Sequence, residues 1–136
     1  MARFVTRPTL SWVGGKYPWR LDEDLAYASD LLGLIRVPAG YCTDFASVPR
    51  IPGIYWAAGG KATLPAIVHD HLYDCWTDRI EREMADRVFR EAMIASGDPK
   101  NGFVRWAMYA AVRLGGGRPW RRDSRHKCIG CGEDNC

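Results

Sequence analysis

The 136-residue sequence lacks any long hydrophobic run. A helix that crosses a membrane needs roughly 18 to 20 consecutive apolar residues, and no segment approaches that length. The first eight residues, Met-Ala-Arg-Phe-Val-Thr-Arg-Pro, also lack the uninterrupted apolar stretch of a secretory signal. We therefore expect neither a transmembrane segment nor a signal peptide.

Low-complexity tracts and internal repeats are absent, and neither sign of charge is in large excess. Nineteen Lys and Arg against sixteen Asp and Glu leave a net charge of +3, which by itself neither indicates nor excludes a nucleic acid partner. With 47% hydrophobic and 26% charged residues, the chain has the composition of a globular protein. Its length fits one domain.

Cysteines are few and odd in number. Three of the five lie within the last nine residues, so any disulfide or metal framework made from them is local.

The first third of the chain alternates strand-forming segments with turn residues. The segments Arg3–Val13, Trp19–Tyr27 and Leu32–Val37 are rich in β-branched and aromatic residues and are separated by Gly, Pro and acidic clusters. They predict a small antiparallel sheet. The Pro- and Gly-rich stretch from Ala39 to Ala62 predicts a long loop without regular structure, and long loops in compact domains are usually functional.

Three helices are predicted after this loop. The first runs from Thr63, near its cap, to about Asp74, and the third from about Asn101 to Arg113. The second runs over about 79–95, with Thr77 or Asp78 as its cap and apolar residues at helical spacing. The fold class is therefore α+β over residues 1–117, followed by a basic, cysteine-rich tail at 118–136.

The first predicted helix carries His69-Asp70-His71-Leu72-Tyr73 at its centre. Helical geometry places His69 and Tyr73 on one face and Asp70 on a neighbouring one, with His71 expected to be exposed. If the first two helices form an antiparallel pair, His69 and Asp86 both lie roughly 8 to 12 Å from the turn and should meet. A carboxylate on one imidazole nitrogen leaves the other nitrogen able to deprotonate a water, as a general base does.

Asp70 is expected to face the incoming loop, which carries Asp44. Two carboxylates and loop carbonyls form a hard oxygen site that suits Ca²⁺ better than zinc. Asp44 can equally cap a turn through its side chain.

The pattern His69-Asp70-x-x-Tyr73, followed by Arg79 or Arg82 and then by Ala85-Asp86-x-x-Phe89 and Met93, resembles the two-helix core of bacterial and fungal secreted phospholipase A2 enzymes. The resemblance implies that His69 is the general base, that Asp86 orients it, and that Tyr73 bonds to the Asp86 carboxylate. It also implies that Asp44 and Asp70 hold a Ca²⁺ ion that polarises the ester carbonyl.

A second resemblance covers more of the chain. Its motifs, in chain order, are similar to those of a family of small phage and prophage proteins catalogued as DUF1353: Thr43-Asp44-Phe45-Ala46-Ser47-Val48-Pro49, His69-Asp70-x-x-Tyr73, Ala85-Asp86-x-x-Phe89 and Arg105-x-x-x-Tyr109-x-x-Val112-Arg113. This resemblance implies a phage virion or an infected bacterial cell as the setting.

The C-terminal tail offers a separate set of ligands. His126, Cys128, Cys131 and Cys136 supply the four donors of a structural zinc, but the cysteines can equally form disulfides, link to a neighbouring chain or stay as thiols. The basic stretch from Arg113 to Lys127 is either a solvated tail or a binding segment for anionic lipid headgroups or DNA, and we favour lipid over DNA.

Three hypotheses of function remain open. The first is a Ca²⁺-dependent, phospholipase A2-like lipid ester hydrolase at a membrane, which requires a solvent-reachable His69. The second is a non-enzymatic virion component in contact with other virion subunits, in which the His/Asp network only locks two helices together. The third is a zinc-dependent hydrolase that uses Asp44, His69, Asp70 and Asp86. Four tryptophans are expected in the core by default, namely Trp56, Trp76, Trp106 and Trp120.

Overall fold

The protein folds into two small antiparallel sheets followed by three packed helices. The structure is a computed structural model that describes residues 1–43, 63–97, 99–117 and 120. Within these ranges the strands come first along the chain and the helices follow, which confirms the predicted α+β class.

The first sheet has the strand order β1-β4-β5. Its strands are β1 (Arg3–Phe4), β4 (Leu25–Ser29) and β5 (Gly33–Val37). The β4–β5 hairpin pairs from Leu25 opposite Val37 to Ser29 opposite Gly33. Gly33 has a φ of 78°, a value that residues with a Cβ rarely adopt, so a glycine suits the end of this turn.

The second sheet has the order β2-β3-β6 and was not predicted as a separate unit. Its strands are β2 (Leu10–Trp12), β3 (Trp19–Leu21) and β6 (Cys42–Thr43). The prediction that regular structure is absent from residue 39 onward is therefore wrong at β6. Backbone hydrogen bonds between Leu21 and both Gly40 and Tyr41 hold this segment along β3, so non-local pairing overrides the local Pro and Gly signal.

The helices are α2 (Thr63–Cys75), α3 (Arg82–Ser96) and α4 (Gly102–Gly115). The first and third lie close to their predicted bounds, whereas α3 begins three residues later than expected. The amides of Arg79 and Ile80 bond to the Trp76 carbonyl in a tight turn, so neither Thr77 nor Asp78 caps the helix.

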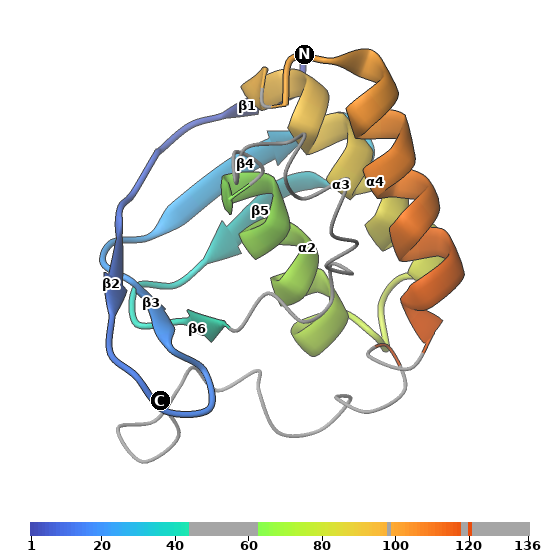
Figure 1. The fold of residues 1–136 in the computed structure, drawn as a ribbon. Helices are drawn as coiled ribbons and strands as arrows, with labels where there is room; N and C mark the ends of the chain where they lie inside the picture. Colours follow the sequence, from blue (N-terminus) through green and yellow to red (C-terminus); the bar gives the residue numbers. More distant parts are fainter. Residues whose placement is uncertain (44–62, 98, 118–119, 121–136) are drawn as a thin grey trace.

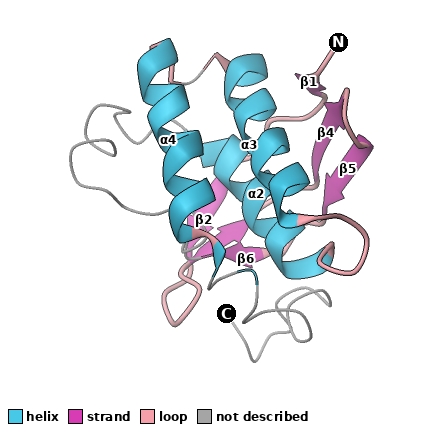
Figure 2. Cartoon of the chain, turned by 90° about the vertical axis from the view of Figure 1, so that its right-hand side faces the viewer, coloured by secondary structure: helices cyan, strands magenta, loops and turns pink. Residues whose placement is uncertain are grey.

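The three helices lie side by side with α3 in the middle, on one side of the two sheets (Figures 1 and 2). α3 packs against α2 and α4 and also contacts β1 and β4. Two hydroxyls of β4 reinforce this contact, because Tyr27 and Ser29 both donate 2.7 Å hydrogen bonds to Oε1 of Glu91. The central position of α3 places Asp86 inside the molecule.

The tryptophans are not all in the core. Trp76 and Trp120 are half-buried against it, and Trp56 lies outside the described residues. Trp106 is exposed on α4, so the expectation of burial is wrong there, because the side chain lies on the face of α4 that points away from α3. No helix in the described ranges is long and apolar enough to cross a membrane.

Candidate functional site

His69 of α2 and Asp86 of α3 meet inside the helical pair, as the spacing predicted. Nε2 of His69 lies 2.8 Å from Oδ1 of Asp86. An ionised carboxylate only accepts hydrogen bonds, so Nε2 carries a proton and donates it to Asp86. In the neutral imidazole, Nδ1 is then the nitrogen that would take a proton from a substrate or water.

Tyr73 binds the same carboxylate oxygen. It lies one turn after His69 on α2, and its hydroxyl donates to Oδ1 of Asp86 at 2.5 Å. The His69 and Tyr73 rings lie 4.2 Å apart between centroids. The contact between Tyr73 and Asp86 that the phospholipase resemblance implied is therefore present.

The second oxygen of Asp86 faces two arginines that belong to the quoted motifs but to which sequence reasoning assigned no role in the site. Nη1 of Arg113, near the end of α4, donates to Oδ2 at 2.8 Å, and Nη1 of Arg82 lies 3.6 Å from it. Arg82 also donates to the carbonyls of Val112 and Arg113, which belong to the last turn of α4. The sequence groups Arg113 with the basic tail, but its side chain is part of the Asp86 network.

Burial and hydrogen bonding shift the pKa of Asp86 in opposite directions. Burial raises its pKa, but hydrogen bonds from His69, Tyr73 and Arg113 outweigh this, so the pKa lies below the ordinary value. For His69, burial lowers the pKa and outweighs the opposing effect of Asp86. Burial and the bond to Asp86 raise the pKa of Tyr73. The ground state thus contains an aspartate anion, a neutral imidazole and a neutral phenol.

His69 and Asp86 are both 0% exposed. The hydrolase hypothesis required a solvent-reachable His69, and the structure contradicts that expectation. The ring packs against Tyr73 on one side and against Phe89, with centroids 4.8 Å apart, on another. In this conformation the imidazole is enclosed by aromatic side chains.

Two carboxylates on the neighbouring face of α2 bond to the strand segment that leads into the long loop. The hydroxyl of Thr43 donates to Oδ2 of Asp70, and the Tyr41 hydroxyl donates to Oδ2 of Asp74 at 2.5 Å. Asp70 is buried and faces the incoming segment, as predicted. Asp74 lies one turn after Asp70, and helical geometry places both on this face, but sequence reasoning assigned Asp74 no role.

Asp44, the other predicted calcium ligand, lies outside the described residues. It directly follows Thr43, whose hydroxyl donates to Oδ2 of Asp70. Among the described residues, no three His, Cys, Asp or Glu side chains gather into a potential metal site. The third hypothesis placed a zinc ion among Asp44, His69, Asp70 and Asp86. The three of these residues that the structure describes do not come together as metal ligands.

His71 is buried, which contradicts the expectation that it is exposed. It faces the Tyr41 ring edge-on at 5.4 Å, so the strand segment before the loop covers this side of α2. Its Nδ1 has no hydrogen-bond partner among the described groups, and burial lowers its pKa to about 4. His126, Cys128, Cys131 and Cys136 lie outside the described residues.

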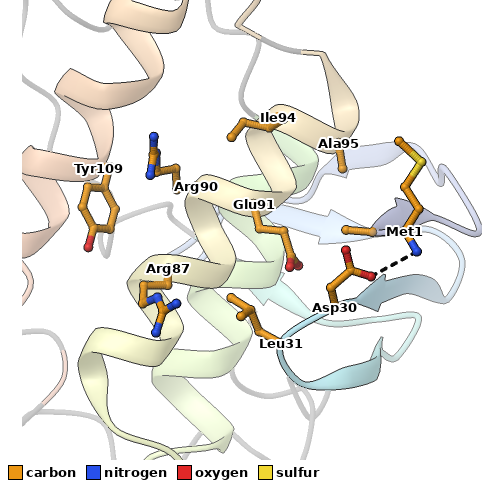
Figure 3. A pocket seen from close by; sticks show the side chains of 10 residues that line it. Met1, Asp30, Leu31, Arg87, Arg90, Glu91, Ile94, Ala95 and Tyr109 are labelled. Atoms are coloured by element: carbon orange, nitrogen blue, oxygen red, sulfur yellow. Dashed lines mark ion pairs between the residues drawn. The ribbon is translucent and has the colours of Figure 1, made fainter.

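A groove of about 520 Å³ lies on the outer side of α3. Figure 3 shows Arg87, Arg90 and Glu91 of α3 beside Tyr109 of α4 and Asp30 of the β4–β5 turn. None of the residues that line it belongs to the His69–Asp86 network.

Comparison with known proteins identifies the family of the chain. A family model described as protein of unknown function (DUF1353) matches residues 19–112. Searches of curated proteins and of solved structures find no match. The matched region covers more than half of the chain and includes His69, Asp70, Tyr73 and Asp86, so the chain belongs to the DUF1353 family.

Proposed function

We propose that this protein is a phage-encoded, phospholipase A2-like hydrolase that cleaves a lipid ester at a membrane in a Ca²⁺-dependent reaction. The observation that carries the proposal is the 2.8 Å contact between Nε2 of His69 and Oδ1 of Asp86 across two antiparallel helices. An oriented, neutral imidazole is the group that a general base requires. The phage virion or the infected bacterial cell is the proposed setting.

Each residue of the network has a role in this proposal. His69 takes a proton from water at Nδ1, Asp86 holds the ring and stabilises the imidazolium that forms, and Tyr73 and Arg113 hold the Asp86 carboxylate in place. Tyr73 and Arg113 are positioning residues, because they act through Asp86. A Ca²⁺ ion held by Asp70 and Asp44 would polarise the ester carbonyl.

The burial of His69 sets a condition on the proposal. Water and an ester carbonyl must reach the imidazole, and in the described conformation the ring has no exposed surface. Productive binding must therefore open a path to the ring. Closed sites of this kind open in many enzymes on substrate binding, when lids or loops move.

Fatty acid release from phospholipid vesicles tests the proposal directly. We expect release with Ca²⁺, little release with a chelator, and loss of release in His69→Gln when circular dichroism shows that this variant is folded. His71→Gln is the matched control, since His71 lies on the same helix outside the network, and it should retain release. No release by the folded wild type, or equal release by His69→Gln, would overturn the proposal.

Metal titration gives a second test that does not depend on turnover. Ca²⁺ that binds only the native state raises the thermal midpoint, and Asp70→Asn should reduce that shift. Zn²⁺ titration of the wild type and of Cys128→Ser tests the proposed tail site formed with His126, Cys131 and Cys136. A Zn²⁺ shift that is equal in both proteins would contradict this tail site.

The burial of His69, Tyr73 and Asp86 favours a second candidate, a non-enzymatic virion component. A carboxylate that takes hydrogen bonds from His69, Tyr73 and Arg113, two of which are almost fully buried, joins α2, α3 and α4 at one point. Such networks often specify a fold without catalysis. This candidate expects the chain to stay in purified particles with other virion subunits, and particles that lack it by mass spectrometry would exclude it.

A further inference from the structure

The outward side of α4 carries a row of apolar side chains that we call the α4 stripe: Phe103, Trp106, Ala110 and Leu114. Phe103 is 74% exposed, Trp106 57% and Leu114 90%. At 100° per residue the four lie within an arc of about 80°, and they span about 16 Å along the helix axis. Figures 1 and 2 show α4 at the outer edge of the helical layer, beside α3.

The core formed by the described residues does not use this stripe. α4 already buries its opposite face against the protein through Val104, Met108 and Val112. The rings of Phe103 and Trp106 contact each other at 6.3 Å between centroids, so the aromatic part of the stripe forms one connected surface. A helix that is apolar on two faces normally has a second partner, because an exposed patch of large apolar residues is rare in a monomer.

The charged residues of α4 itself are all of one sign. α4 contains Arg105 and Arg113 and no acidic residue, and Lys100 precedes it. On the helical wheel Arg113 lies about 20° from Trp106, at the border of the stripe. The sequence after α4 adds further cations, namely Arg118, Arg121, Arg122, Arg125 and Lys127.

We propose that the α4 stripe is the surface by which this protein lies on an anionic lipid bilayer. The inference deepens the proposed function and rests on it. Aromatic and aliphatic side chains bordered by arginines are the composition of helices that lie in the membrane interface, where apolar groups enter the acyl boundary and cations contact anionic headgroups. A second copy of the chain fits less well, because two such faces would bring arginines together without a carboxylate from either α4.

This surface is directly connected to the candidate site. Arg113 borders the stripe and also donates to Asp86. A bilayer that contacts Leu114 and Trp106 would therefore lie beside the end of α4 that holds the His69–Asp86 pair.

Vesicle cosedimentation tests the inference. Wild-type protein should bind vesicles of phosphatidylcholine mixed with phosphatidylglycerol more tightly than pure phosphatidylcholine, and added salt should weaken binding. The triple variant Phe103→Ser, Trp106→Ser, Leu114→Ser should bind at least about tenfold more weakly, since about 1.4 kcal/mol of lost binding energy gives that factor. All three side chains are exposed, so the variant should fold. Trp12→Ser is the matched control, because Trp12 is 65% exposed on β2, far from α4, and its loss should leave binding unchanged.

Fluorescence gives an independent readout of the same contact. Brominated lipid should quench the wild type more than Trp106→Phe, because Trp106 is the tryptophan placed in the stripe. Equal quenching of the two proteins would overturn the inference. So would equal vesicle binding by the triple variant, or a wild-type dimer that the triple variant converts to a monomer without any vesicle binding.

The experiment also separates the two proposals. His69→Gln should bind vesicles as the wild type does. Vesicle binding without fatty acid release would overturn the proposed hydrolase activity and support membrane binding through the α4 stripe. Release from a short-chain ester in solution without vesicle binding would overturn only the proposed membrane binding.

Discussion

His69 and Asp86, 2.8 Å apart between Nε2 and Oδ1, form a hydrogen-bonded pair in which neither side chain reaches solvent. The carboxylate is also held by Tyr73 and Arg113, so three helices depend on one anion. Removing one partner from such a site leaves the others buried without compensation. The network should therefore have measurable effects on stability whether or not it catalyses a reaction.

Asp86→Asn should be strongly destabilising. The substitution removes the charge that compensates Arg113, and breaking a buried pair typically costs about 3–5 kcal/mol in free energy of unfolding. Urea unfolding followed by circular dichroism measures this loss. Glu23→Gln, which removes an exposed carboxylate, is the control and should change stability by no more than about 0.5 kcal/mol. Equal stability of the two variants would contradict the buried network.

Tyr73→Phe should cost about 1.5–3 kcal/mol, because it removes a hydrogen bond to a charged group while keeping the ring. Tyr109→Phe is the matched control, since no hydrogen bond from the Tyr109 hydroxyl is found within the described part of the chain. Both variants can be compared by thermal unfolding, and a Tyr109→Phe effect as large as that of Tyr73→Phe would argue against the prediction.

Gly116→Ala should destabilise the end of α4 by about 1–3 kcal/mol through overpacking. A Cβ at this position would collide with the Tyr73 hydroxyl and lie 3.2 Å from Nη1 of Arg82. The φ of Gly116 is −78°, so the cost is steric and does not come from backbone conformation. Gly102→Ala, whose Cβ would meet nothing closer than 3.7 Å, should be tolerated in the same denaturation assay.

Stability should fall on mild acidification. Burial lowers the pKa of His71 to about 4 from an ordinary value of 6.5, so between these values the unfolded chain binds a proton that the native chain does not. The contribution of the neutral His71 to the free energy of unfolding is complete above pH about 6.5. It is lost toward pH 4 by up to about 1.4 kcal/mol per pH unit. The lowered pKa of His69 acts in the same direction.

Urea midpoints measured between these pH values check the slope. His71→Gln should show a shallower decline, because His69 is then the one described histidine that still contributes in this window. Asp86 contributes separately: its lowered pKa stabilises the native state above its ordinary value of 3.8, and this part is lost only in stronger acid. An unchanged slope in His71→Gln would show that His71 is not the titrating group.

The pairing of His69 with Asp86 could be predicted because it depends only on two helices, their periodicity and a short connection. Arg113 could not be assigned in the same way. It lies 27 residues from Asp86 along the chain, at the edge of a basic stretch, and nothing local distinguishes a cation that points inward from one in a solvated tail. The strand Cys42–Thr43 was missed for the same reason, because its partner is β3.

The sequence alone determined the α+β class, the three helices and the meeting of His69 with Asp86, since periodicity, caps and turn residues are local properties. The tertiary structure decided which charged and aromatic side chains are inside. In the folded protein His69 and His71 are buried, and Arg82 and Arg113 contact Asp86. Three large apolar side chains stay exposed, namely Phe103, Trp106 and Leu114. Burial depends on how α3 packs between α2 and α4, and an amphipathic pattern does not specify which of two apolar faces the core will cover.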